Sequence, residues 1–357
     1  MNETTTMLTE AATRVFADLC TRQALDAAES AFPQSLWAEV EAAGFPAMLA
    51  HERDGGIAAS PSDAVAVLRV AGRYSVPLPL AETMIARRLL SQAGLPSVAG
   101  PLAIALGTAN KRWRLEGAAK NRKLYGTEDS VAWGVDAQAC IVVVDEGTGI
   151  TLGIVEPASL KTEVRRNIAG ESRDRLAADG LPVSTTAHLD QLNLEKVFCM
   201  AALFRAALIV GALEQVLDLC VRYTQERVQF GRPLSRLQAI QQQLAVLAGS
   251  VAASAAITDA ATAAVDHKDG KLMVAAARAR LADAIDTATG IAHQVHGAIG
   301  FAREYTLHFS TRRLWAWRDE YGTAVQWREY VGRTFAGTPA DALWPALAAV
   351  GSKTSVE

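Results

Sequence analysis

The longest apolar run in the chain, VFCMAALFRAALIVGALEQVLDLCV at residues 197–221, constrains the fold more than any other feature. A run of this length and composition can cross a lipid bilayer as a helix. Arg205, Glu214 and Asp218 interrupt it, however, and each of these charges is costly to place in hydrocarbon. We therefore predict a helix buried inside a large helical domain, and no membrane span.

Three further long helices are predicted around this one. Together the patterns predict helices over residues 193–228, 236–266, 271–297 and 304–335. Their interiors are rich in alanine, which lets helices approach one another closely. We expect a C-terminal four-helix bundle over residues 191–337, followed by a tail at 338–357 that ends in a frayed GSKTSVE.

The apolar faces of these helices bear on assembly. Residues 197–221 and the segment LAVLAGSVAASAAITDAATAA at 244–264 leave little polar surface for solvent. Such helices need burial on more than one side. Because a monomer would expose a large apolar patch, we expect a dimer or a tetramer.

The chain before the bundle divides into a helical and a β-rich part. Residues 1–102 predict helices, with Gly44 ending one and Pro61 beginning another. Residues 103–190 contain short runs separated by Gly, Asp and Asn, which predict a small sheet or barrel. Examples of such runs are LAIAL, RWRLEG, KLYG, ACIVVVD and GITLGIVE. The expected fold is therefore mainly α: an N-terminal helical domain, a small middle β domain and a C-terminal four-helix bundle.

Composition and charge exclude several classes of function. The 357 residues carry 35 Lys+Arg and 38 Asp+Glu, a net charge of −3, which argues against a polybasic nucleic-acid surface. The four cysteines lie far apart with no CxxC pair, which disfavours both metal and disulfide frameworks. The start MNETTTMLTEAATRVF lacks the pattern of a secretory signal, so a reduced, cytoplasmic protein is expected. His293 and His296 have no Cys or carboxylate at ligand spacing, so we interpret them as core or capping residues and predict no metal site.

Three stretches together resemble the acyl-CoA dehydrogenase family of flavoproteins. ERVQFGRPLSRLQAIQQQLA (226–245) resembles the family's turn between two long C-terminal helices. QVHGAIGFAREYTLHFSTRRL (294–314) is similar to its Q-x-x-G-G-x-G-F segment, and LWAEVEAAGFPAMLAHERDGG (36–56) to its N-terminal helix and Glu-Gly-Gly turn. The resemblance covers nearly the whole chain. It implies FAD, an acyl-CoA substrate, α,β-desaturation, and electrons passed to an electron-transfer flavoprotein.

The resemblance also implies a set of residues that contact FAD. Arg227 and Phe230 match an R-x-x-F-G turn in which the Arg reaches the FAD pyrophosphate of a neighbouring subunit and the Phe packs on the adenosine half. Gln294 and Gly297 match the Q-x-x-G that lies against the same diphosphate, where glycine permits close backbone approach. Ala298 replaces the family's second glycine, and its methyl group narrows that approach. Each motif also has a purely structural interpretation. Arg227 can be a solvated charge at a helix end, and HGAIG can be only a break between two helices.

The catalytic base is the clearest departure from the family pattern. Many members have Glu before Gly-Thr, and aligning Gly322-Thr323 places Tyr321 there, with Glu320 one residue earlier. A phenol with a pKa of about 10 is a poor base at neutral pH. Glu320 on the same helix would point about 100° away. The other family location, on the first long C-terminal helix, falls on Ala201 and Ala202.

The middle segment departs from the family as well. It has no E-P-x-A-G-S-D loop and no W-I-T strand, and Trp133 is the one aromatic residue that can stand in for a flavin-facing side chain. The alternative is a Trp packed at a strand end. The chain thus matches the family's residues that contact the FAD diphosphate, but it lacks the family's flavin-ring loop and catalytic base.

Three hypotheses follow from this mismatch. The first is the non-catalytic chain of a heteromeric (α2β2) acyl-CoA dehydrogenase, resembling those of bacterial steroid side-chain breakdown, with a partner chain supplying the base. The second is a homotetrameric dehydrogenase that uses Glu320 through a helix register shift. The third is a flavin-free structural paralogue that keeps the bundle as an interaction scaffold.

Overall fold

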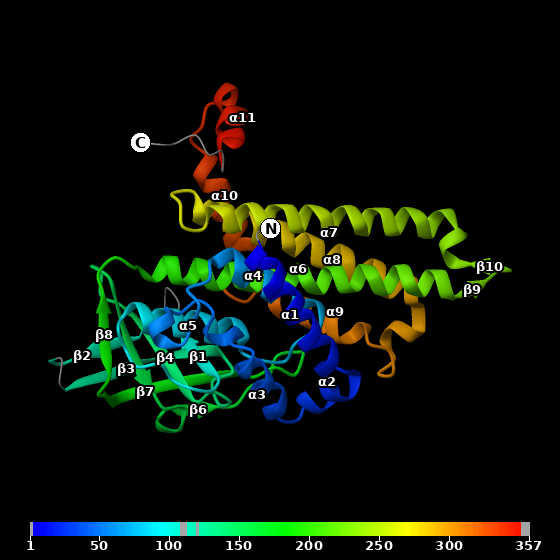
Figure 1. Cartoon of the computed structure of the whole chain (residues 1–357). Helices are drawn as coiled ribbons and strands as arrows, with labels where there is room; N and C mark the ends of the chain where they lie inside the picture. The colour runs from blue at the N-terminus through cyan, green and yellow to red at the C-terminus, as the bar shows by residue number, and fades with distance from the viewer. Residues whose placement is uncertain (1–2, 108–112, 119–120, 351–357) are drawn as a thin grey trace. The chain divides into compact units, whose positions relative to one another are not determined.

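The computed structural model describes residues 3–107, 113–118 and 121–350. Contacts divide the chain into two compact units (Figure 1). One contains Met1–Val67 and Val76–Ala201, and the other contains Leu68–Ser75 and Ala202–Glu357. The expected fraying of GSKTSVE lies outside the described residues, as does the first residue of RWRLEG.

The first unit begins with short helices: α1 (Glu3–Leu19), α2 (Arg22–Ala28), α3 (Gln34–Ala42), the first turns of α4 (Pro61–Arg73), and α5 (Leu80–Gln92). Gly44 adopts φ +77° just beyond α3, which confirms the predicted helix end. Helix α5 is buried on nearly all sides, including the polar Arg87, which pairs with Glu41 and donates to the Gly100 carbonyl at 3.1 Å. Since α5 is enclosed all round, it needs cover from the sheets as well as from helices.

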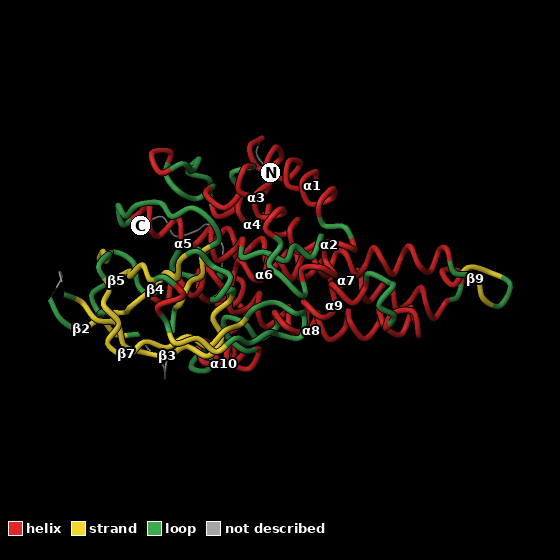
Figure 2. The backbone as a smooth tube through the Cα atoms, turned by 90° about the horizontal axis from the view of Figure 1, so that it is seen from below, coloured by secondary structure: helices red, strands yellow, loops and turns green. Residues whose placement is uncertain are grey.

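Two four-stranded sheets complete this unit, with strand orders β1-β4-β5-β8 and β2-β3-β7-β6. Their bounds are β1 (Leu102–Ala105), β2 (Arg114–Glu116), β3 (Arg122–Ala132), β4 (Ala139–Asp145), β5 (Ile150–Val155), β6 (Lys161–Glu163), β7 (Arg173–Val183) and β8 (Thr186–Leu189). Alternate residues of both sheets share one core, including Cys140 and Val142 from β4, Leu124 from β3 and Leu176 from β7. Figure 2 shows the strands gathered in one region.

Strands β6, β7 and β8 are additional to those expected from the sequence. The sequence of β7, RDRLAADGLPV, contains charges, Gly180 and Pro182, which weaken a strand signal. Pairing with β3 along most of its length stabilises it. A hydrogen bond links the sheets to the helices before them: the Leu102 N–H of β1 donates to Thr83 Oγ1 of α5 at 2.9 Å. The helices before residue 102 and the strands after it lie in one compact unit.

The second unit is helical, and its first three long helices match the sequence prediction to within two residues at each end. They are α6 (Leu194–Glu226), α7 (Gln238–Ala264) and α8 (Gly270–His296), and Figure 1 shows α7 and α8 side by side. The fourth predicted helix, 304–335, is instead two helices, α9 (Leu307–Trp317) and α10 (Ala324–Phe335). The predicted tail contains α11 (Ala340–Ala349).

The break between α9 and α10 has a local cause. Tyr321 and Gly322 adopt φ of +53° and +102°, which no α-helix tolerates. Thr323 then begins α10 with a capping box: its hydroxyl accepts from the Gln326 N–H, and the Gln326 side chain accepts from the Thr323 N–H. Hydrophobic periodicity continues through this break, which is why the sequence pattern predicted one helix.

Two of the three charges within the apolar segment, Glu214 and Asp218, pair with arginines of α4 where α4 crosses α6. A Cβ at Gly211 would lie 1.8 Å from the Arg69 carbonyl oxygen, and one at Gly72 would lie 2.0 Å from that of Leu208, so the two backbones touch. Arg69 pairs with Glu214 beside the crossing. Among the described residues, α6 and α7 are long and apolar enough to cross a membrane, and their most apolar windows are 89% and 33% buried respectively. Helix α6 therefore has the burial of a core helix.

Candidate functional site

The connection between α6 and α7 is a tight hairpin of two short strands, β9 (Val228–Gln229) and β10 (Arg232–Pro233). Phe230 and Gly231 between them adopt φ of +54° and +76°, the left-handed pair that a two-residue hairpin turn requires. The hairpin projects beyond the ends of the long helices (Figure 2). Phe230 is 86% exposed at its tip, and the Arg227 side chain at its base is exposed as well.

The connection between α8 and α9 carries the second predicted set of residues. Gly297 ends α8 with φ +60°, and its N–H donates to the His293 carbonyl. A 3-10 turn, η5 (Gly297–Phe301), follows. The side chains of Gln294 and Ala298 are exposed, and no residue of the described chain other than those next to Gly297 along the backbone comes within 4 Å of where a Gly297 Cβ would be. The turn thus offers open backbone to an approaching group.

The structure brings these two connections to the same end of the second unit. The ring of Tyr223, in the last turns of α6, stacks on the imidazole of His296 with centroids 4.5 Å apart. Arg227 lies one turn beyond Tyr223, and Gln294 and Gly297 flank His296. Residues that are about 70 positions apart in sequence are therefore gathered in one place.

The two histidines contact aromatic side chains. The His296 Nδ1 lies 2.8 Å from the Ala292 carbonyl oxygen, and its Nε2 lies 3.1 Å from the Tyr305 hydroxyl. His293 stacks on Phe301 at 4.4 Å and on Trp315 at 5.7 Å. Burial lowers the pKa of both imidazoles. In the described part of the chain, no group of three or more His, Cys, Asp or Glu is placed to hold a metal ion.

Large apolar side chains are exposed at this end of the bundle. We call them the bundle-end patch: Val228, Phe230, Ile299, Phe301 and Trp315. Phe301 alone is 72% exposed. An exposed apolar cluster beside cationic and amide groups is typical of a surface covered by a ligand or by another chain.

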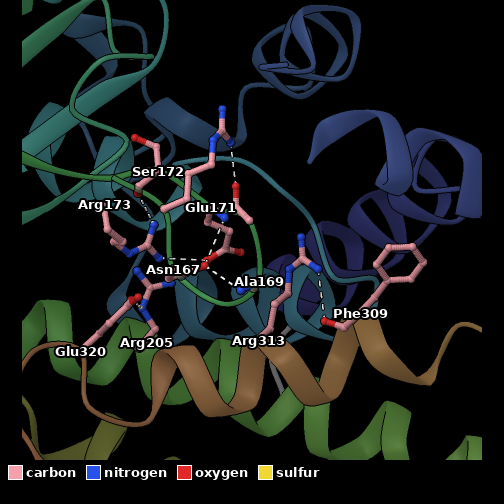
Figure 3. Close-up of polar contacts among 11 residues, drawn as sticks. Asn167, Ala169, Glu171, Ser172, Arg173, Arg205, Phe309, Arg313 and Glu320 are labelled. Atoms are coloured by element: carbon pink, nitrogen blue, oxygen red, sulfur yellow. Dashed lines mark hydrogen bonds and ion pairs between the residues drawn. The ribbon is translucent and has the colours of Figure 1, made fainter. Parts of the chain in front are cut away.

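The predicted base positions lie in a different part of the second unit, after α9. The Glu320 carboxylate pairs with the Arg205 Nε at 2.9 Å, and the two side chains are 15% and 4% exposed (Figure 3). The Arg205 guanidinium lies 5.5 Å from the centre of the Trp317 ring and 5.6 Å from that of Tyr321. The Glu320 carboxylate is thus engaged by a guanidinium that is itself enclosed by two aromatic rings.

A second buried arginine fixes the same loop. One Nη of Arg278 donates to the carbonyl oxygens of Trp317, Arg318 and Glu320, at 3.1, 2.9 and 2.7 Å. Burial, and next the charge of Arg205, lower the pKa of Arg278 to about 10. Ala201 and Ala202, at the family's other base location, are buried in α6 and have no proton-accepting side chain.

Sequence reasoning noticed Arg205 only as a charge in an apolar run, and it missed Arg278 and Tyr305. The available signal was the buried charge itself, since a buried arginine requires partners. The sequence leaves Trp133 as the aromatic residue that can stand in for a flavin-facing side chain. The structure buries it in the first unit at φ +59°, with its ring edge-on to Phe32 at 6.0 Å.

The exposed groups at the bundle end suit a diphosphate. Arg227 offers a planar pair of N–H donors, Gln294 an amide, and the Gly297 turn a backbone that no Cβ shields. Ala298 lies on the exposed side of the turn, where its methyl group meets solvent. The residues present therefore fit the diphosphate of FAD.

Two family models match the chain, and together they cover more than half of it. The N-terminal domain of acyl-CoA dehydrogenases matches residues 2–97, and the C-terminal domain matches residues 194–323. The chain is 28% identical over 292 residues to the acyl-CoA dehydrogenase IpdE2 of Mycobacterium tuberculosis, covering 80% of this chain and 82% of that protein.

Solved structures share the fold. The ChsE4-ChsE5 complex from Mycobacterium tuberculosis contains a chain with a TM-score of 0.86 and 23% identity, covering 95% of this chain and 99% of that one. A steroid acyl-CoA dehydrogenase variant, Tcur3481-Tcur3483, has a TM-score of 0.84 and 24% identity, with 93% and 97% covered. The chain therefore has the acyl-CoA dehydrogenase fold, in which two helical parts accompany a small β-rich part. The chain belongs to the acyl-CoA dehydrogenase family.

Proposed function

We propose that this chain is the non-catalytic subunit of a heteromeric FAD-dependent acyl-CoA dehydrogenase, in which it contributes contacts to the FAD diphosphate. One observation carries the proposal: Tyr321 occupies the usual base position, and the neighbouring Glu320 is paired with Arg205. A partner chain of the same family then supplies the carboxylate and the pocket for the flavin ring.

Each group at the bundle end has a defined task in this proposal. Arg227 binds the diphosphate through two parallel hydrogen bonds, and Gln294 donates its amide. The open turn at Gly297 lets backbone approach the phosphates, and Phe230 covers the adenosine half. The bound flavin supplies the hydride acceptor for the desaturation of an acyl-CoA.

The bundle-end patch supports a second chain. Its large apolar side chains are exposed in the single chain, which is typical of a surface that another chain covers. The structural relatives add support, since one is a ChsE4-ChsE5 complex and another is a steroid acyl-CoA dehydrogenase variant. We therefore propose an α2β2 heterotetramer in the cytoplasm that acts on a lipid or steroid acyl-CoA and passes electrons to an electron-transfer flavoprotein.

The test is the visible spectrum and the native mass of the chain, purified alone and after co-expression with acyl-CoA dehydrogenase chains from the same genome. We expect a colourless chain alone, and a yellow, active complex with both chains. A chain that is yellow and active alone would overturn the proposal in favour of Glu320 as base. A complex that never contains FAD would favour the flavin-free scaffold.

A further inference from the structure

The segment after α8 folds over one imidazole, that of His296. This residue is 3% exposed, and its ring stacks on Tyr223 with an interplanar angle of 26°. A Cβ at Gly300 would lie 3.0 Å from the His296 Cβ, so the backbone of the turn rests directly on the histidine. Any displacement of the imidazole therefore displaces the turn.

The hydrogen bonds of His296 fix its tautomer. A carbonyl oxygen only accepts, so the Nδ1 at 2.8 Å from the Ala292 oxygen carries the hydrogen. In the neutral ring the Nε2 is then the acceptor, and the Tyr305 hydroxyl at 3.1 Å donates to it. The His296 imidazole thus links the last turn of α8 to Tyr305, which lies just before α9.

The surroundings keep both groups in the protonation states that this bond needs. The titratable and charged groups around the pair are Cys220, Arg222, Tyr223 and Glu226 on α6, His293 on α8 and His308 on α9. Burial lowers the pKa of His296. Burial first, and then Cys220 and Glu226, raise the pKa of Tyr305. A neutral imidazole therefore faces a protonated phenol at neutral pH.

His293 adds a second attachment to the same turn. Its ring lies against Phe301, the last residue of the turn, at 4.4 Å. The site where a Gly300 Cβ would be is 3.4 Å from its Nδ1. The two histidines together hold the turn at its middle and at its end.

We propose that His296 and Tyr305 form a positioning pair whose hydrogen bond holds the Gly297–Phe301 turn in the form that receives the FAD diphosphate. Neither side chain touches the cofactor. The inference rests on the proposed function, in which this turn contacts the diphosphate. Protonation of His296 puts a hydrogen on Nε2, so the Tyr305 hydroxyl must turn from donor to acceptor, and it places a charge on a buried ring against the turn. Both changes disturb the turn, so FAD affinity falls on the acid side of neutrality.

The test uses the co-purified complex, with the FAD dissociation constant measured by flavin fluorescence and the bound diphosphate observed by 31P NMR. Tyr305→Phe removes one hydroxyl and leaves the rings. We expect about three- to tenfold weaker FAD binding at about pH 8 and shifted 31P resonances. Wild-type affinity is full above about pH 6.5, the ordinary pKa of histidine, and falls at lower pH, whereas this variant shows no such step. Tyr330→Phe, whose ring faces Lys271 at 4.3 Å, is the matched control and should behave as wild type.

A second variant separates positioning from packing. His296→Gln offers an amide oxygen to Tyr305 but does not titrate, so we expect FAD binding within about threefold of wild type at about pH 8 and no acid step. If Tyr305→Phe lowers the melting temperature of the complex but keeps wild-type FAD affinity and pH profile, the pair is only structural and the inference is wrong.

The proposed function is tested separately by Arg227→Ala. Weaker FAD binding in Arg227→Ala with wild-type binding in Tyr305→Phe would overturn the positioning pair and leave the diphosphate site standing. Wild-type binding in both variants would overturn the site and the pair together.

Discussion

A phenol at position 321 stands where the family pattern has a carboxylate, and the only adjacent carboxylate, Glu320, pairs with a buried guanidinium. Two aromatic rings, those of Trp317 and Tyr321, lie against the same guanidinium. This arrangement stabilises Arg205 inside the second unit and gives Glu320 a structural task. In the proposed function, the contacts of this chain to FAD therefore lie at the bundle end and not around position 321.

Glu320→Gln tests this assignment. It removes the carboxylate that pairs with the buried Arg205, so we expect unfolding to require about 3 kcal/mol less free energy. The turnover number of the assembled complex, measured well below its melting temperature, should stay within about twofold of wild type. Loss of turnover in a folded, FAD-loaded complex would instead identify Glu320 as the base.

Arg227→Lys tests the fork geometry of the guanidinium. Lysine keeps the charge but cannot donate two parallel hydrogen bonds, so we expect FAD to bind about tenfold more weakly to the complex. Titration with FAD, followed by quenching of its fluorescence, measures this. Arg236→Lys, on the exposed turn before α7, is the matched control and should leave affinity unchanged.

At the scale of elements, the crossing of α4 and α6 depends on two glycines. With 1.8 Å between a Gly211 Cβ and the Arg69 carbonyl oxygen, no side chain fits without moving a helix. Helix α7 also contains a glycine, Gly249, but nothing lies within 4 Å of its Cβ position. Replacement of glycine by alanine should therefore lower the stability of the chain at position 211 and raise it at position 249.

Gly211→Ala should destabilise the chain by about 3 kcal/mol because it separates two packed backbones. Gly249→Ala should stabilise it by about 0.5–1 kcal/mol, since alanine loses less conformational entropy in a helix. Denaturant midpoints of the two variants and of wild type measure the difference. Equal midpoints for both variants would contradict the close crossing.

At the scale of the whole molecule, the free energy of unfolding depends on pH through two histidines. His296 is buried and His293 is half-buried, and burial lowers the pKa of both, so both are neutral in the folded chain at neutral pH and titrate near their ordinary value of 6.5 when unfolded. Below that value the unfolded chain binds more protons than the folded chain. Stability is thus full above about pH 6.5 and falls as the pH drops toward the lowered values.

His293→Phe tests this, since phenylalanine preserves the stack with Phe301 and Trp315 and cannot titrate. We expect its melting temperature to fall less than that of wild type between about pH 7 and pH 5. His267→Gln, in the exposed turn before α8, is the control and should keep the wild-type slope. A His293→Phe slope equal to that of wild type would remove this imidazole from the acid sensitivity.

The surface of α7 supports the proposed assembly. Its most apolar window is only 33% buried in the single chain, compared with 89% for α6. The sequence expectation that such helices need cover on more than one side leads to the proposed oligomer. The native mass of the co-expressed complex tests it.

The sequence by itself determined the long helices, because apolar periodicity and alanine content are local properties that survive without tertiary contacts. It also located Arg227 and Gln294 through short motifs. It did not predict the break at Tyr321–Gly322, because positive φ at a tyrosine is held by surroundings that have no local signature.

Only the tertiary structure decided which distant residues meet. The pairing of Arg205 with Glu320 and the stacking of Tyr223 on His296 each join segments that are far apart in the chain. Neither contact is encoded by the residues next to it. Burial makes both necessary, since an enclosed charge needs a partner and an enclosed imidazole needs an acceptor and a donor. The fold supplies those partners, and so decides which of the motif residues become a site.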